Sequence, residues 1–361
     1  MKYGIMTYHN IPNFGAILQA YSLCKVINEL GYECDVIDYE CQNIVKRELE
    51  YHGSGNAIKL ALHRVFSWPH VEKKILQCQE FARQYYSKEK YTLKTIPKAN
   101  KMYDGFISGS DMIWNLDVNG YDYSYFLDFA NEGKKKIAYG SSIGDCWKDT
   151  DKSKIKNLLE QYDAISVREE DTSCYIREAF GLPCKWVADP TMLLPTPFWE
   201  SCTTPVKEKE YVIVYFPSDH LIETAKEYCK LHNKKLIVLR VMLPWKRKGS
   251  KILYSPNEWL SYLKDADAVF TNSYHGLLFS LYFNKPVWTD NQSNRVQALL
   301  KRLNLECCNL KNDTTCSNVI DYRQCNKLIQ SFREDSLEYL KSVLSGNKNE
   351  RTNHENFCGQ V

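Results

Sequence analysis

Short runs rich in β-branched and aromatic residues alternate with longer amphipathic runs in this sequence. KYGIMTY at 2–8 and CDVIDYE at 34–40 have the composition of strands, and AILQAYSLCKVINELG at 16–31 lies between them. In that middle segment the apolar residues recur every three to four positions and Gly31 provides a stop signal, which predicts a helix. Strand, helix and strand in this order form the unit from which parallel sheets are built. The pattern therefore predicts an α/β fold.

The same alternation continues along most of the chain. Further strands are expected at 104–109, 136–142, 164–167, 185–189, 211–216, 235–241, 268–272 and 286–289. Further helices are expected near 220–232, near 257–264, from Leu277 onward and at roughly 319–344, where the last one is expected to pack back on the first half. The exception is the charged segment 43–100, which we interpret as a helical excursion outside the sheet.

A break in the pattern divides the chain. LLPTPFWESCTTPVKEKE at 193–210 contains three prolines and a charged stretch. We expect an N-terminal α/β domain over 1–197, a C-terminal α/β domain over 205–345, and a polar tail over 346–361. Two Rossmann-like, doubly wound domains would place the carboxyl ends of their strands around a shared cleft, where ligands bind in such folds.

Composition excludes several classes of protein. The formal net charge of +3 is too small to indicate a nucleic-acid binder. The 14 cysteines are scattered, with no CxxC pair and no spacing suited to zinc, so reduced and mostly buried thiols are expected. MKYGIMTYHN at the N-terminus has no signal-peptide pattern, and no stretch approaches the ~18 apolar residues that span a bilayer. We therefore expect a cytoplasmic protein.

Four expected strand ends carry polar clusters with glycine. They are TYHNIPNFGA at 7–16, SGSDMIWN at 108–115, YGSSIGD at 139–145 and TNSYHG at 271–276. Glycine allows the backbone to approach a ligand closely, and polar groups can satisfy the open N–H groups of a following helix. None of the four has the glycine spacing of a Walker loop or a dinucleotide fingerprint, so a nucleotide cofactor is not supported.

Together with VREED at 167–171, VADPTMLL at 187–194 and FNKP at 283–286, these motifs resemble the polysaccharide pyruvyl transferase family. The resemblance runs from residue 3 to about residue 305, outside the 43–100 segment. Its most specific elements are NFGAILQAYSL, GSD-x-x-WN, DPT-x-LL and S-[FY]-HG, in that order. It implies a pair of GT-B-like domains that transfer the enolpyruvyl group of phosphoenolpyruvate to a sugar as a ketal, with release of phosphate.

The donor implied by this resemblance carries a carboxylate and a phosphate, which guanidinium groups and backbone N–H groups bind well. Arg168 and Arg295 are placed for such contacts, although either can instead belong to a solvated charged surface. Ser273 and a helix N-terminus at Gly276 are expected to add N–H donors and the positive end of a dipole.

The reaction also requires proton transfer, for which His275 is the candidate general acid or base. Asp111 or Asp189 is expected to act on the sugar hydroxyl, although aspartate at such turns often only caps a helix. The expected acceptor-binding residues are His9, Asn13, Gly15, Ser110, Trp114 and Ser142. Structural roles in turns and caps explain several of these equally well.

The proposed reaction needs no metal or cofactor besides phosphoenolpyruvate as donor substrate, and the sequence offers no metal cluster. The basic run KRKGSK at 246–251 is either solvated or, if the sugar acceptor is lipid-linked, in contact with anionic headgroups at the inner membrane surface. Two other functions remain open: a GT-B glycosyltransferase that uses a nucleotide sugar, and a non-catalytic glycan-binding relative.

Overall fold

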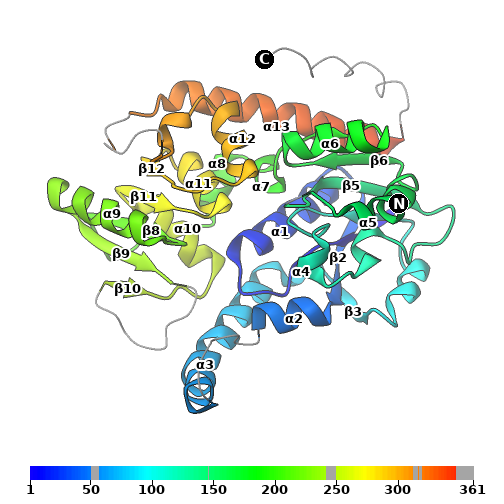
Figure 1. The fold of residues 1–361 in the computed structure, drawn as a ribbon, viewed down its shortest axis with the longest axis horizontal. Coiled ribbons are helices and arrows are strands. Elements are labelled where there is room, and N and C mark those ends of the chain that lie inside the picture. The colour runs from blue at the N-terminus through cyan, green and yellow to red at the C-terminus, as the bar shows by residue number, and fades with distance from the viewer. Residues whose placement is uncertain (50–56, 145, 241–248, 312–315, 317–318, 347–361) are drawn as a thin grey trace.

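The protein is described by a computed structural model that covers residues 1–49, 57–144, 146–240, 249–311, 316 and 319–346 (Figure 1). Within these ranges the chain forms two parallel sheets with helices packed against them. Residues 246–248 of the basic run and residues 347–361 of the expected polar tail lie outside the described residues. The α/β fold with two parallel sheets confirms the predicted fold class.

The N-terminal sheet has seven parallel strands in the order β3-β2-β1-β4-β5-β6-β7. Their bounds are Lys2–Met6 (β1), Glu33–Glu40 (β2), Tyr86–Thr92 (β3), Gly105–Ser108 (β4), Lys135–Ser141 (β5), Ala164–Val167 (β6) and Lys185–Trp186 (β7). The central strand β4 is buried along its whole length, as in parallel sheets with helices on both faces. The chain order reverses between β1 and β4, and in doubly wound sheets ligands bind at the carboxyl ends of the strands beside such a reversal.

The helices of this half cover both faces and the lower edge of the sheet. They are α1 (Phe14–Glu29), α2 (Gln42–Leu49), α3 (Ala57–Ala82), α4 (Leu116–Asn119), α5 (Asp149–Leu159), α6 (Glu170–Phe180), α7 (Pro190–Leu193) and α8 (Thr196–Ser201), with 3-10 turns at Arg83–Tyr85, Ile96–Lys101 and Tyr123–Phe126. Helix α1 is buried almost all round, because it lies between the N-terminal sheet and helix α10 of the other half.

The C-terminal sheet has five parallel strands in the order β10-β9-β8-β11-β12. Its elements are β8 (Tyr211–Tyr215), α9 (Asp219–His232), β9 (Lys235–Leu239), β10 (Ser250–Lys251), α10 (Pro256–Asp265), β11 (Ala268–Thr271), α11 (Tyr274–Tyr282), β12 (Val287–Trp288), α12 (Asn294–Arg302), a 3-10 turn (Glu306–Cys308) and α13 (Tyr322–Ser345).

The last helix returns to the N-terminal half, as the sequence predicted. Helix α13 runs across the top of both halves in Figure 1. Ser336 Oγ on this helix accepts a hydrogen bond from the Ala188 N–H at 2.8 Å, and Lys135 Nζ donates to the Val343 carbonyl at 2.6 Å. Helix α13 therefore packs against the N-terminal half and is held there by hydrogen bonds.

The interpretation of 43–100 as an excursion outside the sheet is wrong for residues 86–92. YSKEKYT forms β3, which pairs in parallel with β2 at the edge of the seven-stranded sheet. Lys88, Glu89 and Lys90 are exposed there. Charged side chains are common on edge strands because they discourage pairing with other chains. Here they replace the apolar residues by which a strand is predicted from sequence.

The two halves share one hydrophobic core. The ring of Phe14, at the start of α1, lies 5.7 Å from the Trp259 ring of α10, and the Trp259 ring lies 5.4 Å from Phe279 of α11. All three side chains belong to a continuous buried cluster that reaches from β1 to α13. Direct packing between aromatic side chains therefore fixes the C-terminal helices against α1.

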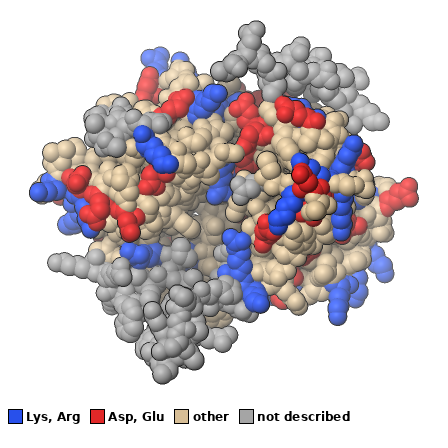
Figure 2. All heavy atoms as spheres, viewed as in Figure 1, with Lys and Arg blue, Asp and Glu red and all other residues tan. Residues whose placement is uncertain are grey.

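Other global expectations concern cysteines, membranes and charge. All thirteen cysteines in the described ranges are free thiols, and most are buried. No helix in these ranges combines the length and apolar character needed to cross a bilayer. On the face shown in Figure 2, basic and acidic side chains are interspersed rather than gathered into a large patch of one sign.

Lys74 of α3 is buried without a counter-ion in the described part of the chain. It is 2% exposed, and its Nζ lies 4.0 Å from the centre of the Phe14 ring. Burial lowers the pKa of Lys74 from 10.5 to about 8. The unfolded chain binds this proton more tightly, so the charged amine destabilises the fold below pH 8, and the penalty disappears as pH rises toward 10.5.

We predict that Lys74→Met raises the free energy of unfolding at pH 7 by up to about 3 kcal/mol, the equivalent of the pKa shift. Urea denaturation at pH 7 and pH 10 measures the effect, which should shrink at the higher pH. Lys73→Met is the control, because Lys73 is exposed on the same helix. A lower stability of the Lys74 variant at pH 7 would contradict the prediction.

Candidate active site

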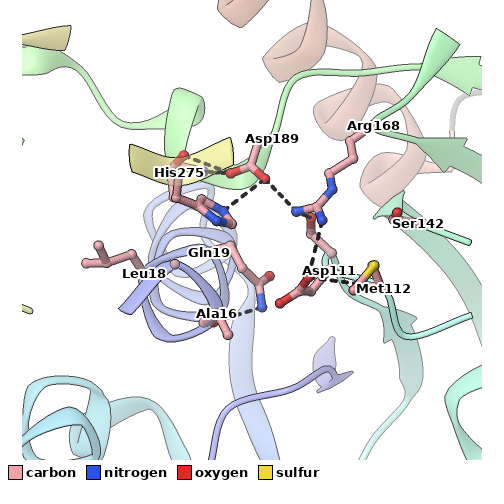
Figure 3. Close-up of polar contacts among 12 residues, drawn as sticks. Ala16, Leu18, Gln19, Asp111, Met112, Ser142, Arg168, Asp189 and His275 are labelled. Carbon is pink, nitrogen blue, oxygen red and sulfur yellow. Dashed lines mark hydrogen bonds and ion pairs between the residues drawn. The ribbon is translucent and has the colours of Figure 1, made fainter. Parts of the chain in front are cut away.

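Polar side chains from neighbouring strand ends meet above the N-terminal sheet (Figure 3). Ser110 and Asp111 follow β4, Ser142 follows β5, Arg168 follows β6, and Asp189 follows β7. The carboxyl ends of adjacent parallel strands lie at one edge of a sheet, so residues far apart in the sequence converge there. The strand order therefore brings the predicted site residues Ser110, Asp111, Ser142 and Arg168 close together, along with Asp189.

Arg168 is the centre of this group and its side chain is 1% exposed. Its Nη2 donates to Asp111 Oδ1 at 3.2 Å, its Nε to Glu169 Oε1 at 3.3 Å, and its Nη1 to Asp189 Oδ2 at 3.0 Å. Nη1 also donates to Ser110 Oγ at 3.3 Å. Burial opposes the charged guanidinium, but the three carboxylates outweigh burial and raise the pKa of Arg168. Arg168 thus holds the carboxylates in place.

Asp111 occupies a strained backbone conformation with φ of 74°. Its carbonyl accepts a hydrogen bond from the Ser142 N–H at 3.1 Å, and its Oδ1 accepts one from the Met112 N–H at 2.9 Å. Non-glycine residues in the left-handed region cost free energy and persist where surrounding contacts enforce them, which occurs often at functional sites. Asp111 therefore stays a candidate site residue whose conformation is enforced by its neighbours.

Glu169 was overlooked as a chemical group in the sequence, where it appeared only as part of VREED. Its Oε1 accepts a hydrogen bond from Ser142 Oγ at 2.6 Å, besides the bond from Arg168. Its Oε2 is buried without a hydrogen-bond partner in the described structure. Burial raises the pKa of Glu169 despite the nearby Arg168. A buried carboxyl group with a raised pKa can hold a proton and donate it.

His275 joins the group from the C-terminal half. Its Nε2 lies 3.4 Å from Asp189 Oδ2, but the geometry is too poor for a hydrogen bond, and Nε2 is buried without another partner in the described structure. Burial alone would raise the pKa of Asp189, but His275 and Arg168 outweigh burial and lower it. Asp189 therefore stays ionised and can orient the imidazole ring.

Gly15 makes this approach possible. A Cβ atom at Gly15 would overlap the His275 ring, so α1 can lie against His275 only because residue 15 has no side chain. The neighbouring Asn13 is the N-cap of α1, and its Oδ1 accepts the Gly15 N–H at 3.0 Å. Both were expected to bind the acceptor; the structure places them at the start of α1, in supporting contacts.

Gln19 is a site residue that the sequence interpretation missed. It is fully buried, and its Nε2 donates to Thr7 Oγ1 at 2.8 Å and to the Ala16 carbonyl at 2.9 Å. These bonds fix the orientation of the amide, whose Oε1 has no partner in the described structure. Figure 3 shows the amide between His275 and Asp111. The available signal was the four-residue spacing from Gly15, which puts both on one face of a helix.

Arg295 lies in the first turn of α12, close to the Arg168 group. Asn294 Nδ2 donates to Asp171 Oδ2 of α6 at 2.6 Å, which holds this turn against the N-terminal half. Burial and repulsion from Arg168 lower the pKa of Arg295, while Asp111 and Glu169 oppose this effect. The guanidinium makes no hydrogen bond or ion pair with any residue of the described ranges. It is therefore available to an anion.

The expectation of a helix N-terminus at Gly276 is corrected by the structure. Helix α11 begins two residues earlier, at Tyr274, with Ser273 as N-cap. Ser273 Oγ accepts the Gly276 N–H at 3.2 Å, so this donor is already engaged. Gly276 is needed instead for close packing, because a Cβ there would lie 2.5 Å from Thr271 Oγ1.

Two further expected acceptor-binding residues lie away from the open part of the site. Trp114 is fully buried, stacks on Phe126 at 5.3 Å and donates its Nε1–H to the Tyr125 carbonyl at 3.1 Å. Its burial contradicts a role as an exposed sugar platform.

His9 faces β2, where its Nε2 lies 3.2 Å from Asp38 Oδ1. Its second ring nitrogen bonds a carbonyl, which fits the structural interpretation of a satisfied turn histidine.

Comparison with known proteins assigns the chain to a family. The family model for polysaccharide pyruvyl transferases matches residues 13–289. The chain belongs to the polysaccharide pyruvyl transferase family. The matched range contains the ends of β2 to β7 and His275, but neither the end of β1 nor Arg295. No curated protein matched the sequence.

Solved structures similar to this pyruvyl transferase family member show the same fold at very low sequence identity. UDP-GlcNAc 2-epimerase from Neisseria meningitidis bound to UDP-GlcNAc is 8% identical with a TM-score of 0.54, and the match covers 96% of this chain and 100% of the other. Arabidopsis thaliana UGT89C1 complexed with UDP is 10% identical with a TM-score of 0.50, covering 95% and 99%. These likenesses support the GT-B-like architecture alone.

We predict that Gly15→Ala displaces the His275 ring, because the new methyl group requires the space that the ring occupies. NMR spectra of histidine-labelled protein measure this displacement as a shift of the ring signal that His275→Gln removes. Gly31→Asn serves as control, since Gly31 ends α1 with open space around it and asparagine tolerates its φ of 87°. An unmoved His275 signal in the Gly15 variant would refute the contact.

Proposed function

We propose that the protein transfers the enolpyruvyl carbons of phosphoenolpyruvate to two hydroxyls of one sugar in a glycan or lipid-linked glycan precursor, forming a ketal and releasing phosphate. Family membership supports this reaction class. The observation that carries the proposal is a set of polar groups around one site that have no hydrogen-bond partner among the described residues: Arg295, Glu169 Oε2, His275 Nε2 and Gln19 Oε1. Buried polar groups without partners are rare, and a bound substrate would satisfy them.

Arg295 is the proposed anchor for the anionic donor. Phosphoenolpyruvate offers a carboxylate and a phosphate, and a guanidinium binds either with paired N–H donors. Arg168 has five N–H groups, of which four are engaged within the protein. Arg168 can therefore contribute one remaining N–H and its positive charge to donor binding. Arg295 can contribute all the N–H donors of its guanidinium group.

Proton transfer is the second task of the site. The methylene carbon of the donor gains a proton, the central carbon becomes cationic, one sugar oxygen bonds to it, and phosphate leaves with the electrons of its C–O bond. A second sugar oxygen then bonds to the same carbon; of the two hydroxyl protons, one replaces the proton given to the methylene carbon and the other leaves on the phosphate. We assign the first proton to His275 or Glu169, and removal of a hydroxyl proton to Asp111.

Gln19 contacts the acceptor in this proposal, and the two serines position the charged groups. Gln19 Oε1 can accept a hydrogen bond from a sugar hydroxyl, because Thr7 and the Ala16 carbonyl hold its amide in one orientation. Ser110 and Ser142 bond Arg168 and Glu169, so they position the charged groups.

We predict that the protein releases phosphate from phosphoenolpyruvate only when a suitable glycan acceptor is present. His275→Gln should lower this rate by about 100-fold or more, because a positioned acid or base contributes 10²–10⁴-fold. A phosphate assay over galactose, mannose and glucosamine-type acceptors measures the rate. His232→Ala is the matched control, because His232 is exposed at the end of α9. No release with any acceptor would refute the reaction, and a normal rate in the His275 variant would refute its role.

We predict that phosphoenolpyruvate raises the melting temperature of the wild-type protein, because it binds the folded state alone. Arg295→Met should abolish most of this increase, whereas Lys301→Met, an exposed change on the same helix, should preserve it. UDP and UDP-sugars are tested in parallel, since UDP-bound proteins share the fold. Stabilisation by UDP instead of phosphoenolpyruvate would favour a glycosyltransferase, and stabilisation by glycans alone a binding protein.

A further inference from the structure

A separate pocket of about 250 Å³ opens beside the candidate active site. It lies between the segment that follows β4 and the segment that joins β5 to α5. The pocket reaches the site through the backbone: Asn115 Nδ2 donates to the Ile143 carbonyl at 2.8 Å, and both residues line the pocket. Ile143 follows Ser142, the partner of Glu169, and adjacent Cα atoms are about 3.8 Å apart. Ile143 therefore connects the lining of the pocket along the chain to a residue that bonds Glu169.

Tyr121 presents an aromatic ring at the mouth of this pocket. It is 42% exposed and has a φ of 63°, directly after Gly120 with a φ of 70°. Its N–H donates to the Leu116 carbonyl at 3.0 Å, and its hydroxyl accepts a hydrogen bond from Lys148 Nζ at 3.3 Å. A tyrosine at a positive φ carries a backbone cost, and such conformations are often kept at functional sites.

The floor and the charge of the pocket limit what can bind. Trp147 forms part of the lining and is held by a hydrogen bond from its Nε1 to the Trp114 carbonyl at 2.9 Å. Lys148 Nζ pairs with Asp117 Oδ1 at 2.8 Å, so its charge is balanced, and Asp151 adds a second carboxylate. The lining therefore has a small excess of negative charge, which disfavours a phosphate or carboxylate.

A neutral sugar fits these properties. The flat apolar face of a pyranose ring packs on an aromatic ring such as Tyr121, while its hydroxyls donate to carboxylates and to amide oxygens. We propose that this pocket binds a neutral sugar unit of the acceptor glycan, adjacent to the sugar that receives pyruvate. The proposal rests on the proposed function for its glycan acceptor, and it assigns to Tyr121 the selection of that acceptor.

Binding to an array of neutral oligosaccharides tests the pocket without requiring turnover. The wild-type protein and Tyr121→Phe should bind the same glycans. Tyr121→Asn, which tolerates the positive φ but removes the ring, should weaken that binding by tenfold or more. The melting-temperature increase caused by phosphoenolpyruvate should be equal in all three, because Tyr121 does not touch the proposed donor-binding residues.

Alkylation of Cys146 gives an independent readout of occupancy. Cys146 lines the pocket and is exposed. An oligosaccharide that binds on the array should slow its modification by iodoacetamide, measured by mass spectrometry of the Cys146 peptide, whereas phosphoenolpyruvate should not. Binding to no neutral glycan, equal binding by the Tyr121→Asn variant, or unprotected Cys146 would each overturn the pocket proposal. Failure of the proposed reaction would appear separately, as absence of acceptor-dependent phosphate release.

Discussion

The buried ion cluster around Arg168 is the interaction on which the rest of the site depends. One guanidinium joins Asp111, Glu169 and Asp189, which come from the ends of three different strands. Removing one member of such a buried group typically costs about 3–5 kcal/mol, because the remaining charges lose their compensation. With three carboxylates against one arginine, the cluster keeps an excess of negative charge, and Arg295 and His275 lie beside it. In our proposal, Arg295 supplies the positive charge that an anionic donor needs beside this cluster.

The second requirement is that the two halves of the chain pack closely. His275 comes from the C-terminal half, but its partner Asp189 opens α7 and its neighbour Gly15 belongs to α1. The Phe14–Trp259 contact and the return of α13 hold these elements together. The catalytic histidine in our proposal is thus positioned by the shared core.

Much of the fold could be predicted because parallel strands buried on both faces give strong apolar signals. The strand expected at 164–167 is found there, and most others differ by one to three residues at their ends. The edge strand β3 was missed because its side chains are charged, and the short β10 because it has two residues. The start of α11 was misplaced because Ser273, rather than Gly276, is the cap, and polar residues before an apolar run permit several helix starts.

The sequence by itself determined the fold class, the family motifs and the positions of Arg168, Asp111 and His275 at strand ends, because these follow from local periodicity and from residue types in order. Only the tertiary structure decided the partners. The N–H donors of Arg168 bond three carboxylates, and Arg295 has no partner in the described ranges. Trp114 is buried, and Gln19 lies in the candidate site. Which donors and acceptors are satisfied depends on contacts between distant segments, and spacing along one chain carries no information about such contacts.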